Sequence, residues 1–205
     1  MFKPVLNQLS KAAALATLVA ASGAVLAQAT TTTTTPPAAT GAAATTSRAS
    51  ASASRTDALS RDDRKFVEAA AQGGLAEVQH GNLAAQRATN PQVKQFAQRM
   101  VQDHSKANDE LKTIASARGI TPPTTMDRKH HRAMEKLGKL NGAEFDREYM
   151  KHMVDDHKKD VSLYEKQAKS GKDGDLKSFA AKTLPILQEH LALAQSTQDA
   201  LKAAK

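Results

Sequence analysis

The chain has 205 residues, of which 40% are hydrophobic and 3% aromatic, with no cysteine and no tryptophan. This length suits a single domain, and the lack of cysteine excludes disulfides, thiolate metal sites and lipid attachment through cysteine. So few aromatic residues argue against an all-β sandwich or barrel. Four of the 29 basic residues precede Asp57, where the first of the 21 acids occurs, so residues 57–205 carry a net charge of only +4. This ordinary surface charge predicts no nucleic-acid partner.

Residues 1–29 have the pattern of a secretory signal peptide. Lys3 and Lys11 supply positive charge, and residues 12–27 are uncharged and largely apolar. Small residues allow cleavage after Ala27 or Ala29. A membrane anchor is the alternative, but the run is shorter than the roughly 20 residues needed to span a bilayer. We therefore expect no transmembrane segment after cleavage, and a periplasmic or secreted location.

Residues 30–56 are of low complexity. They comprise a run of six threonines at 30–35, Pro36-Pro37, and then mainly alanine, serine and threonine. Such a composition cannot bury a core, so we predict a disordered linker. The linker could act as a spacer through or along the cell wall, or it could be an unconstrained tail. A spacer would suit a cell-envelope partner.

Helix signals then continue to the end of the chain. The first helix is expected to begin near Ser60, which resembles the first residue of a capping box with Asp63. Asn90-Pro91 ends this helix and starts the next, because asparagine is a good N-cap and proline suits the first helical position. The second helix has the clearest amphipathic pattern of the chain and should end at Gly119.

A shorter helix is predicted from about Thr125 to Leu140, and two long helices follow, divided by a turn at residues 170–174. Pro185 lies inside the last helix and should kink it. Long helices joined by short turns form antiparallel bundles. Residues 57–205 are therefore predicted to be one all-α domain, an antiparallel four-helix bundle of the ferritin-like kind with a short extra helix before the third long helix.

One polar residue capable of binding metal lies on or beside the apolar stripe of each long helix: Glu77, His104, His157 and His190. Counted from the connecting turns at roughly 1.5 Å per residue, the members of each hairpin differ in height by only about 3–6 Å. All four could then meet in the middle of the bundle. Imidazole and carboxylate groups bind Zn, Fe, Mn or Cu, so these four residues form a candidate site for a divalent metal.

The alternative is a structural role, in which the histidines belong to a buried hydrogen-bond network. Each histidine is directly preceded by an acid that points about 100° away on the helix and should contact another helix rather than the same ion: Asp103, Asp156 and Glu189. The remaining histidines are expected to face solvent, His130 being the least certain: His80, His130, His131 and His152.

Enzymatic activity is not predicted. Di-iron bundles use a Glu-x-x-His motif on two helices, whereas the residues three before the candidate histidines are Val101, Val154 and Leu187. This argues against ferroxidase or oxygenase chemistry.

Four stretches together resemble a known family: AAQGGLAEV at 70–78, VKQFAQRMVQDH at 93–104, GAEFD at 142–146 leading to MVDDH at 153–157, and FA at 179–180 leading to Leu184-Pro185 and His190. They resemble bacterial domain-of-unknown-function family 4142, whose members are often labelled outer-membrane proteins and grouped with ferritin-like bundles. The resemblance covers about residues 60–200 and places the four candidate residues on recurring motif positions of the family. It implies a helical bundle in the cell envelope and no established reaction.

Three hypotheses follow. The first is an exported metal-binding bundle with a role in envelope or metal stress. The second is a purely structural envelope protein with a buried network of histidines and acids. The third is a redox enzyme that uses a bound metal.

Overall fold

The structure is a computed structural model that describes residues 59–204. The predicted signal peptide (1–29) and linker (30–56) lie outside the described residues. The described part contains five helices and no strand: α1 (Arg61–Arg87), α2 (Pro91–Ser116), α3 (Arg128–Gly138), α4 (Gly142–Ser170) and α5 (Gly174–Ala203). The predicted all-α class is confirmed.

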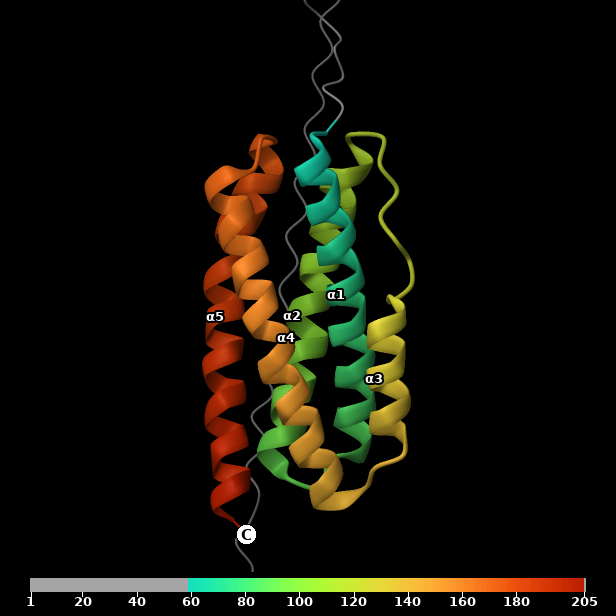
Figure 1. The fold of residues 1–205 in the computed structure, drawn as a ribbon, viewed down its shortest axis with the longest axis vertical. Helices are drawn as coiled ribbons and strands as arrows, with labels where there is room; N and C mark the ends of the chain where they lie inside the picture. The colour runs from blue at the N-terminus through green and yellow to red at the C-terminus, as the bar shows by residue number, and fades with distance from the viewer. Residues whose placement is uncertain (1–58, 205) are drawn as a thin grey trace, which may run out of the picture. The chain divides into compact units, whose positions relative to one another are not determined.

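The four long helices form two hairpins that pack together (Figure 1). One hairpin is α1–α2 and the other is α4–α5, while α1 also packs on α4 and α2 on α5. Each long helix runs antiparallel to both of its neighbours. The chain crosses from α2 back to the start of α4 along the bundle, and α3 lies in this crossover against α1 and α4. One long crossover of this kind is typical of ferritin-like bundles.

Side-chain caps fix where the helices begin. The Ser60 hydroxyl accepts a hydrogen bond from the backbone N–H of Asp63 at 3.1 Å, and the Asn90 side chain accepts from the first turn of α2. These are the predicted caps. The crossover helix is shorter than the predicted 125–140, because the Asp127 carboxylate caps the backbone N–H of His130 and sets the start at Arg128. α5 continues through Pro185.

Two buried aspartates tie the turns at opposite ends of the bundle. Asp63 accepts hydrogen bonds from Gln167 Nε2 at 2.8 Å and from backbone N–H groups in the α4–α5 turn. Asp146 on α4 accepts from the backbone N–H groups of Thr89 and Asn90 in the α1–α2 turn. Each carboxylate therefore fixes the register of one hairpin against the other.

Two apolar clusters fill the bundle. The first, near the α1–α2 turn, includes Phe96, Met100, Tyr149 and Met153. The second, near the α4–α5 turn, includes Phe66, Leu111, Tyr164 and Phe179. Along every long helix at least one buried polar residue falls between the two clusters, and these residues include Glu77, His104, His157 and His190. The candidate site is therefore a polar layer between two apolar cores. Among the described helices none combines the length and apolar character needed to cross a membrane.

Candidate metal centre

The structure brings three of the four candidate residues together. His104 on α2, His157 on α4 and His190 on α5 each offer one ring nitrogen, and these nitrogens lie within 4.8 Å of one another. The ring centroids form a nearly equilateral triangle with sides of 5.4, 5.5 and 5.6 Å. We call these three residues the histidine triad. It could hold a metal ion.

One nitrogen of each triad residue is buried without a hydrogen-bond partner: Nε2 of His104, Nε2 of His157 and Nδ1 of His190. A buried polar atom left unpaired costs about 1–3 kcal/mol. Three such atoms in one place are therefore a marked departure from the usual pairing of buried polar groups. These three atoms make the triad a candidate ligand site.

Hydrogen bonds outside the triad decide which nitrogens are free. Nδ1 of His157 lies 2.9 Å from the backbone carbonyl of Met153. Because a carbonyl only accepts, Nδ1 carries the proton and Nε2 keeps its lone pair. Nε2 of His190 likewise lies 3.0 Å from Asp103 Oδ2 and donates to it, which leaves the lone pair on Nδ1. Metal-binding histidines are commonly oriented in this way through their second nitrogen.

Burial also keeps the triad neutral. It lowers the pKa of His104 well below the usual 6.5, and the neighbouring histidines act in the same direction. It lowers the pKa of His157 to about 4. For His190, burial lowers the pKa and the hydrogen bond to Asp103 opposes it. At neutral pH all three rings are uncharged, which is the form that binds a metal.

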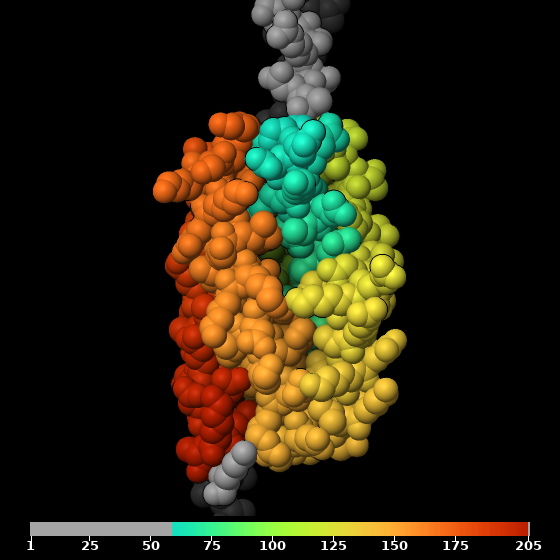
Figure 2. Space-filling view, viewed as in Figure 1, coloured from blue at the N-terminus to red at the C-terminus, as the bar shows by residue number. Residues whose placement is uncertain are grey.

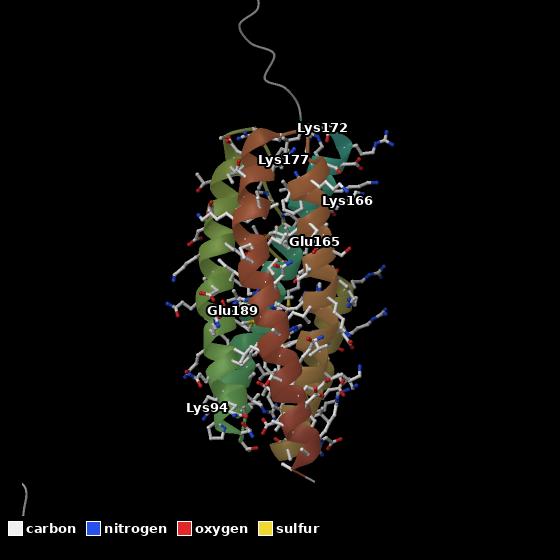
Figure 3. The ribbon with its side chains drawn as sticks, turned by 90° about the vertical axis from the view of Figure 1, so that its left-hand side faces the viewer. Lys94, Glu165, Lys166, Lys172, Lys177 and Glu189 are labelled. Atoms are coloured by element: carbon white, nitrogen blue, oxygen red, sulfur yellow. The ribbon has the colours of Figure 1, made fainter. Side chains whose placement is uncertain are left out.

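The acids that precede the histidines contact other helices, as predicted. Asp103 on α2 binds His190 on α5, and it also accepts from Arg99 Nε at 3.2 Å. Glu189 on α5 lies beside α2 (Figure 3). It pairs with Arg99 at 2.8 Å across the α2–α5 seam. Asp156 on α4 faces α3, where Lys129 lies 3.3 Å from its Oδ1. A chain from Glu189 through Arg99 and Asp103 therefore holds His190 in place.

Glu77 occupies a different position from the triad. It is 2% exposed, and its Oε1 lies 3.7 Å from Nδ1 of His157, on the edge of the ring away from the free Nε2. Its Oε2 is buried without a partner. Burial raises the pKa of this carboxyl well above 4.5, and Asp160 and Asp156 raise it further. Glu77 therefore lies behind His157 and outside the group of three nitrogens.

A pocket of about 230 Å³ between α2 and α5 reaches the triad from the surface. His104 and His190 contribute to its lining, together with Thr183 and Leu187. Lys182 and Glu110, which form a 2.7 Å ion pair between the two helices, also line it. The pocket gives a small solute a route to two of the three histidines.

The expectation that the other histidines face solvent is wrong for three of the four. His80 is fully buried, and the side chains of His130 and His152 are only 13% and 14% exposed. They meet between α1, α3 and α4, and only His131 is exposed. The docking of α3 buries these rings, and a helical pattern taken one helix at a time does not show it. One sequence feature could have indicated that His80 is buried: it follows Glu77 by three residues and so lies on the same side of the helix.

The fold and the site together define a helical-bundle protein with a buried histidine triad that could hold a metal ion. The chain belongs to the DUF4142 family, described as a domain of unknown function, which matches residues 48–197. A comparison with curated proteins gave no match.

Several solved structures share the fold. A DUF305 fragment from Deinococcus radiodurans superposes with a TM-score of 0.60 at 12% identity, covering 71% of this chain and 98% of that one. A DUF305 protein from Streptomyces coelicolor, provisionally classed as secreted, gives 0.59 at 14% identity, with coverages of 69% and 94%. CopM in its Cu(II)-bound form gives 0.58 at 17% identity, with coverages of 67% and 95%. At these identities the likeness is one of fold.

Proposed function

We propose that this DUF4142 protein is an exported metal-binding protein that holds a copper ion at the histidine triad. The observation that carries the proposal is the meeting of three buried, unpartnered imidazole nitrogens from three different helices. The role that follows is to sequester metal in the cell envelope, as part of a response to metal stress.

The donor set supports copper within the predicted group of Zn, Fe, Mn and Cu. Imidazole suits copper and zinc, and among divalent first-row ions copper binds nitrogen donors most tightly. Manganese prefers oxygen donors, and Glu77 lies outside the three-nitrogen group. The structural neighbour CopM has been solved with Cu(II) and also in an Ag-bound form, the latter at 18% identity and a TM-score of 0.55.

The protein's own residues serve to bind and retain the ion. His104, His157 and His190 would be the ligands, and a bound copper would supply a tightly held cationic centre. The triad residues are 6%, 0% and 1% exposed, so the bundle shields the site from bulk water. A buried site reached by a narrow pocket favours retention over rapid turnover. We therefore propose binding rather than catalysis.

Export rests on the predicted signal peptide at residues 1–29, with cleavage after Ala27 or Ala29. The neighbouring DUF305 protein provisionally classed as secreted supports the same compartment. Fractionation of cells that express the full chain tests this part. We expect the mature form outside the cytoplasm, with an N-terminus at residue 28 or 30, and a full-length cytoplasmic form would contradict export.

Metal analysis tests the binding site directly. The full chain is purified without a histidine tag, exposed to copper and dialysed, beside the His104→Ala/His157→Ala double variant. His131→Ala is the matched control, because it removes an exposed histidine. We expect the wild type and the control each to bind one copper per chain more than the double variant.

A wild type that stays metal-free after reloading would overturn the proposal and leave the triad as a structural hydrogen-bond network. If the double variant does not fold, the single substitution His104→Gln replaces it. His104 is the most exposed of the three, at 6%.

A further inference from the structure

A second group of histidines lies apart from the triad, where α1, α3 and α4 meet. Nδ1 of His80 is 3.1 Å from Nε2 of His152, and that same Nε2 is 3.1 Å from Asp156 Oδ2. Nε2 of His130 is 3.6 Å from the same carboxylate oxygen. The three histidines and Asp156 therefore form a chain of four donor atoms from three helices, which we call the crossover cluster.

From these contacts we infer a second metal site, for a divalent ion such as Zn²⁺, formed by Asp156 with His130, His152 and His80. Two ligands on one tetrahedral zinc, at bonds of about 2.0–2.1 Å, lie roughly 3.3 Å apart. The successive distances in the crossover cluster are 3.1, 3.1 and 3.6 Å. Among the described residues only the histidine triad has three donor atoms within 4.8 Å of one another. An ion that takes Asp156 Oδ2 and His152 Nε2 would therefore draw in the imidazoles of His80 and His130 by side-chain movement.

Protonation in the cluster is compatible with an ion. Nε2 of His80 lies 3.2 Å from the backbone carbonyl of His130 and must donate to it, so Nδ1 of His80 carries a lone pair. The proton on Nε2 of His152 is then shared between His80 and Asp156. An ion would replace this proton, which moves to Nδ1 of the same ring, so that the imidazole stays neutral. Burial already lowers the pKa of His80 to about 4 and favours neutral rings.

A surface pocket leads to the crossover cluster, and Oδ2 of Asp156 is not occupied by a lysine. A pocket of about 280 Å³, lined by His130, Asp127, Asp156 and Glu77 among others, opens at this place, and Figure 2 shows the surface hollowed between α1, α3 and α4. Lys129 and Lys159 contact Asp156 through Oδ1, at 3.3 and 2.6 Å, which leaves Oδ2 facing the imidazoles. Both lysine side chains are more than half exposed and free to move when an ion arrives.

The site would also have a structural consequence. His130 is the member of the cluster on α3, and α3 belongs to the crossover rather than to the four-helix core. An ion bound there would tie the crossover to α1 and α4. Zinc should therefore slow hydrogen exchange in α3 more than in the long helices.

Zinc titration of the full chain at pH 7 tests the site, with His130→Asn as the variant. Asparagine is too short to reach the ion, and the backbone carbonyl that His80 uses is unchanged. His131→Asn is the matched control, one residue along the same helix and exposed. We expect His130→Asn to bind one zinc fewer than the wild type, or the same site at least about tenfold more weakly, and to lose the protection of α3. The control should behave as the wild type.

The inference fails if His130→Asn and the wild type bind the same number of ions with the same affinity, or if His131→Asn causes an equal loss. The test compares the zinc stoichiometry and affinity of His130→Asn with those of the wild type. It therefore does not depend on whether the triad binds zinc, and failure of the copper site would be seen separately in the triad variant.

Discussion

Replacing Asp103 by asparagine tests whether the histidine triad is set up by the residue behind it. The Asp103 carboxylate is the acceptor that keeps the proton of His190 on Nε2 and the lone pair on Nδ1, at 3.0 Å. An asparagine can turn its NH₂ group toward His190, which would move the ring proton to Nδ1, where it would point at the ion. The variant should therefore bind metal more weakly although no ligand has been removed.

The structure sets the size of the effect. A hydrogen bond to a charged group contributes about 1.5–3 kcal/mol. Because the Asp103 side chain is 24% exposed, solvent screens part of this, and we take about 1.5–2 kcal/mol. That corresponds to roughly a 10- to 30-fold rise in Kd.

The assay is a copper titration of the full chain at pH 7 against a chelator of known affinity. Asp109→Asn is the control, since it makes the same charge change on an exposed side of α2. Equal affinity in wild type and Asp103→Asn, with unchanged helix content, would refute the role of Asp103. An equal loss in Asp109→Asn would show that only overall charge matters.

Three further predictions concern pH and stability. At pH 5.5 a site of three ordinary histidines would lose roughly 1000-fold in metal affinity, because protons compete for the nitrogens. Burial lowers the pKa of His157 to about 4 and lowers the pKa values of His104 and His190, so the metal affinities measured at pH 7 and pH 5.5 should differ far less. A loss of roughly 1000-fold would contradict the buried geometry. Asp63→Ala should lower the free energy of unfolding by about 3 kcal/mol in urea, because it leaves buried donors unpaired, whereas Asp62→Ala, at an exposed position of the same turn, should change it little. Gly81→Ala should destabilise by about 1–3 kcal/mol through overpacking, since its new Cβ would lie 3.0 Å from the Ala97 carbonyl oxygen; Gly138→Ala, which meets nothing within 4 Å, should be neutral or stabilising in the same assay.

Much of the fold could be predicted because its signals are local. Ser60 and Asn90 cap their helices through their own side chains, and each acts within three residues. The alternation of apolar positions along α2 places Phe96 and Met100 in the core without reference to any other helix. The exact start of α3 was harder to predict from the sequence, because Asp127 is one of several polar residues that could have capped the helix.

The candidate site was likewise predictable only where it depends on local features of the helices. The sequence alone placed His104, His157 and His190 at similar heights on three helices, because height follows from the rise per residue and the turn positions. It could not decide the rotation of Glu77 about its own helix, which puts its carboxyl behind His157. It also could not show that α3 folds back over His80 and His152, since that burial depends on the path of the crossover.

The sequence by itself therefore determined the helices, their order and the polar layer within them, because helical periodicity and caps act over a few residues. The tertiary structure alone decided which nitrogen of His190 is free, since this depends on Asp103 from another helix contacting the far side of the ring. It also decided that four donors from α1, α3 and α4 meet in the crossover cluster. Contacts between helices distant in the chain are set by the packing of whole faces, and no local pattern records them.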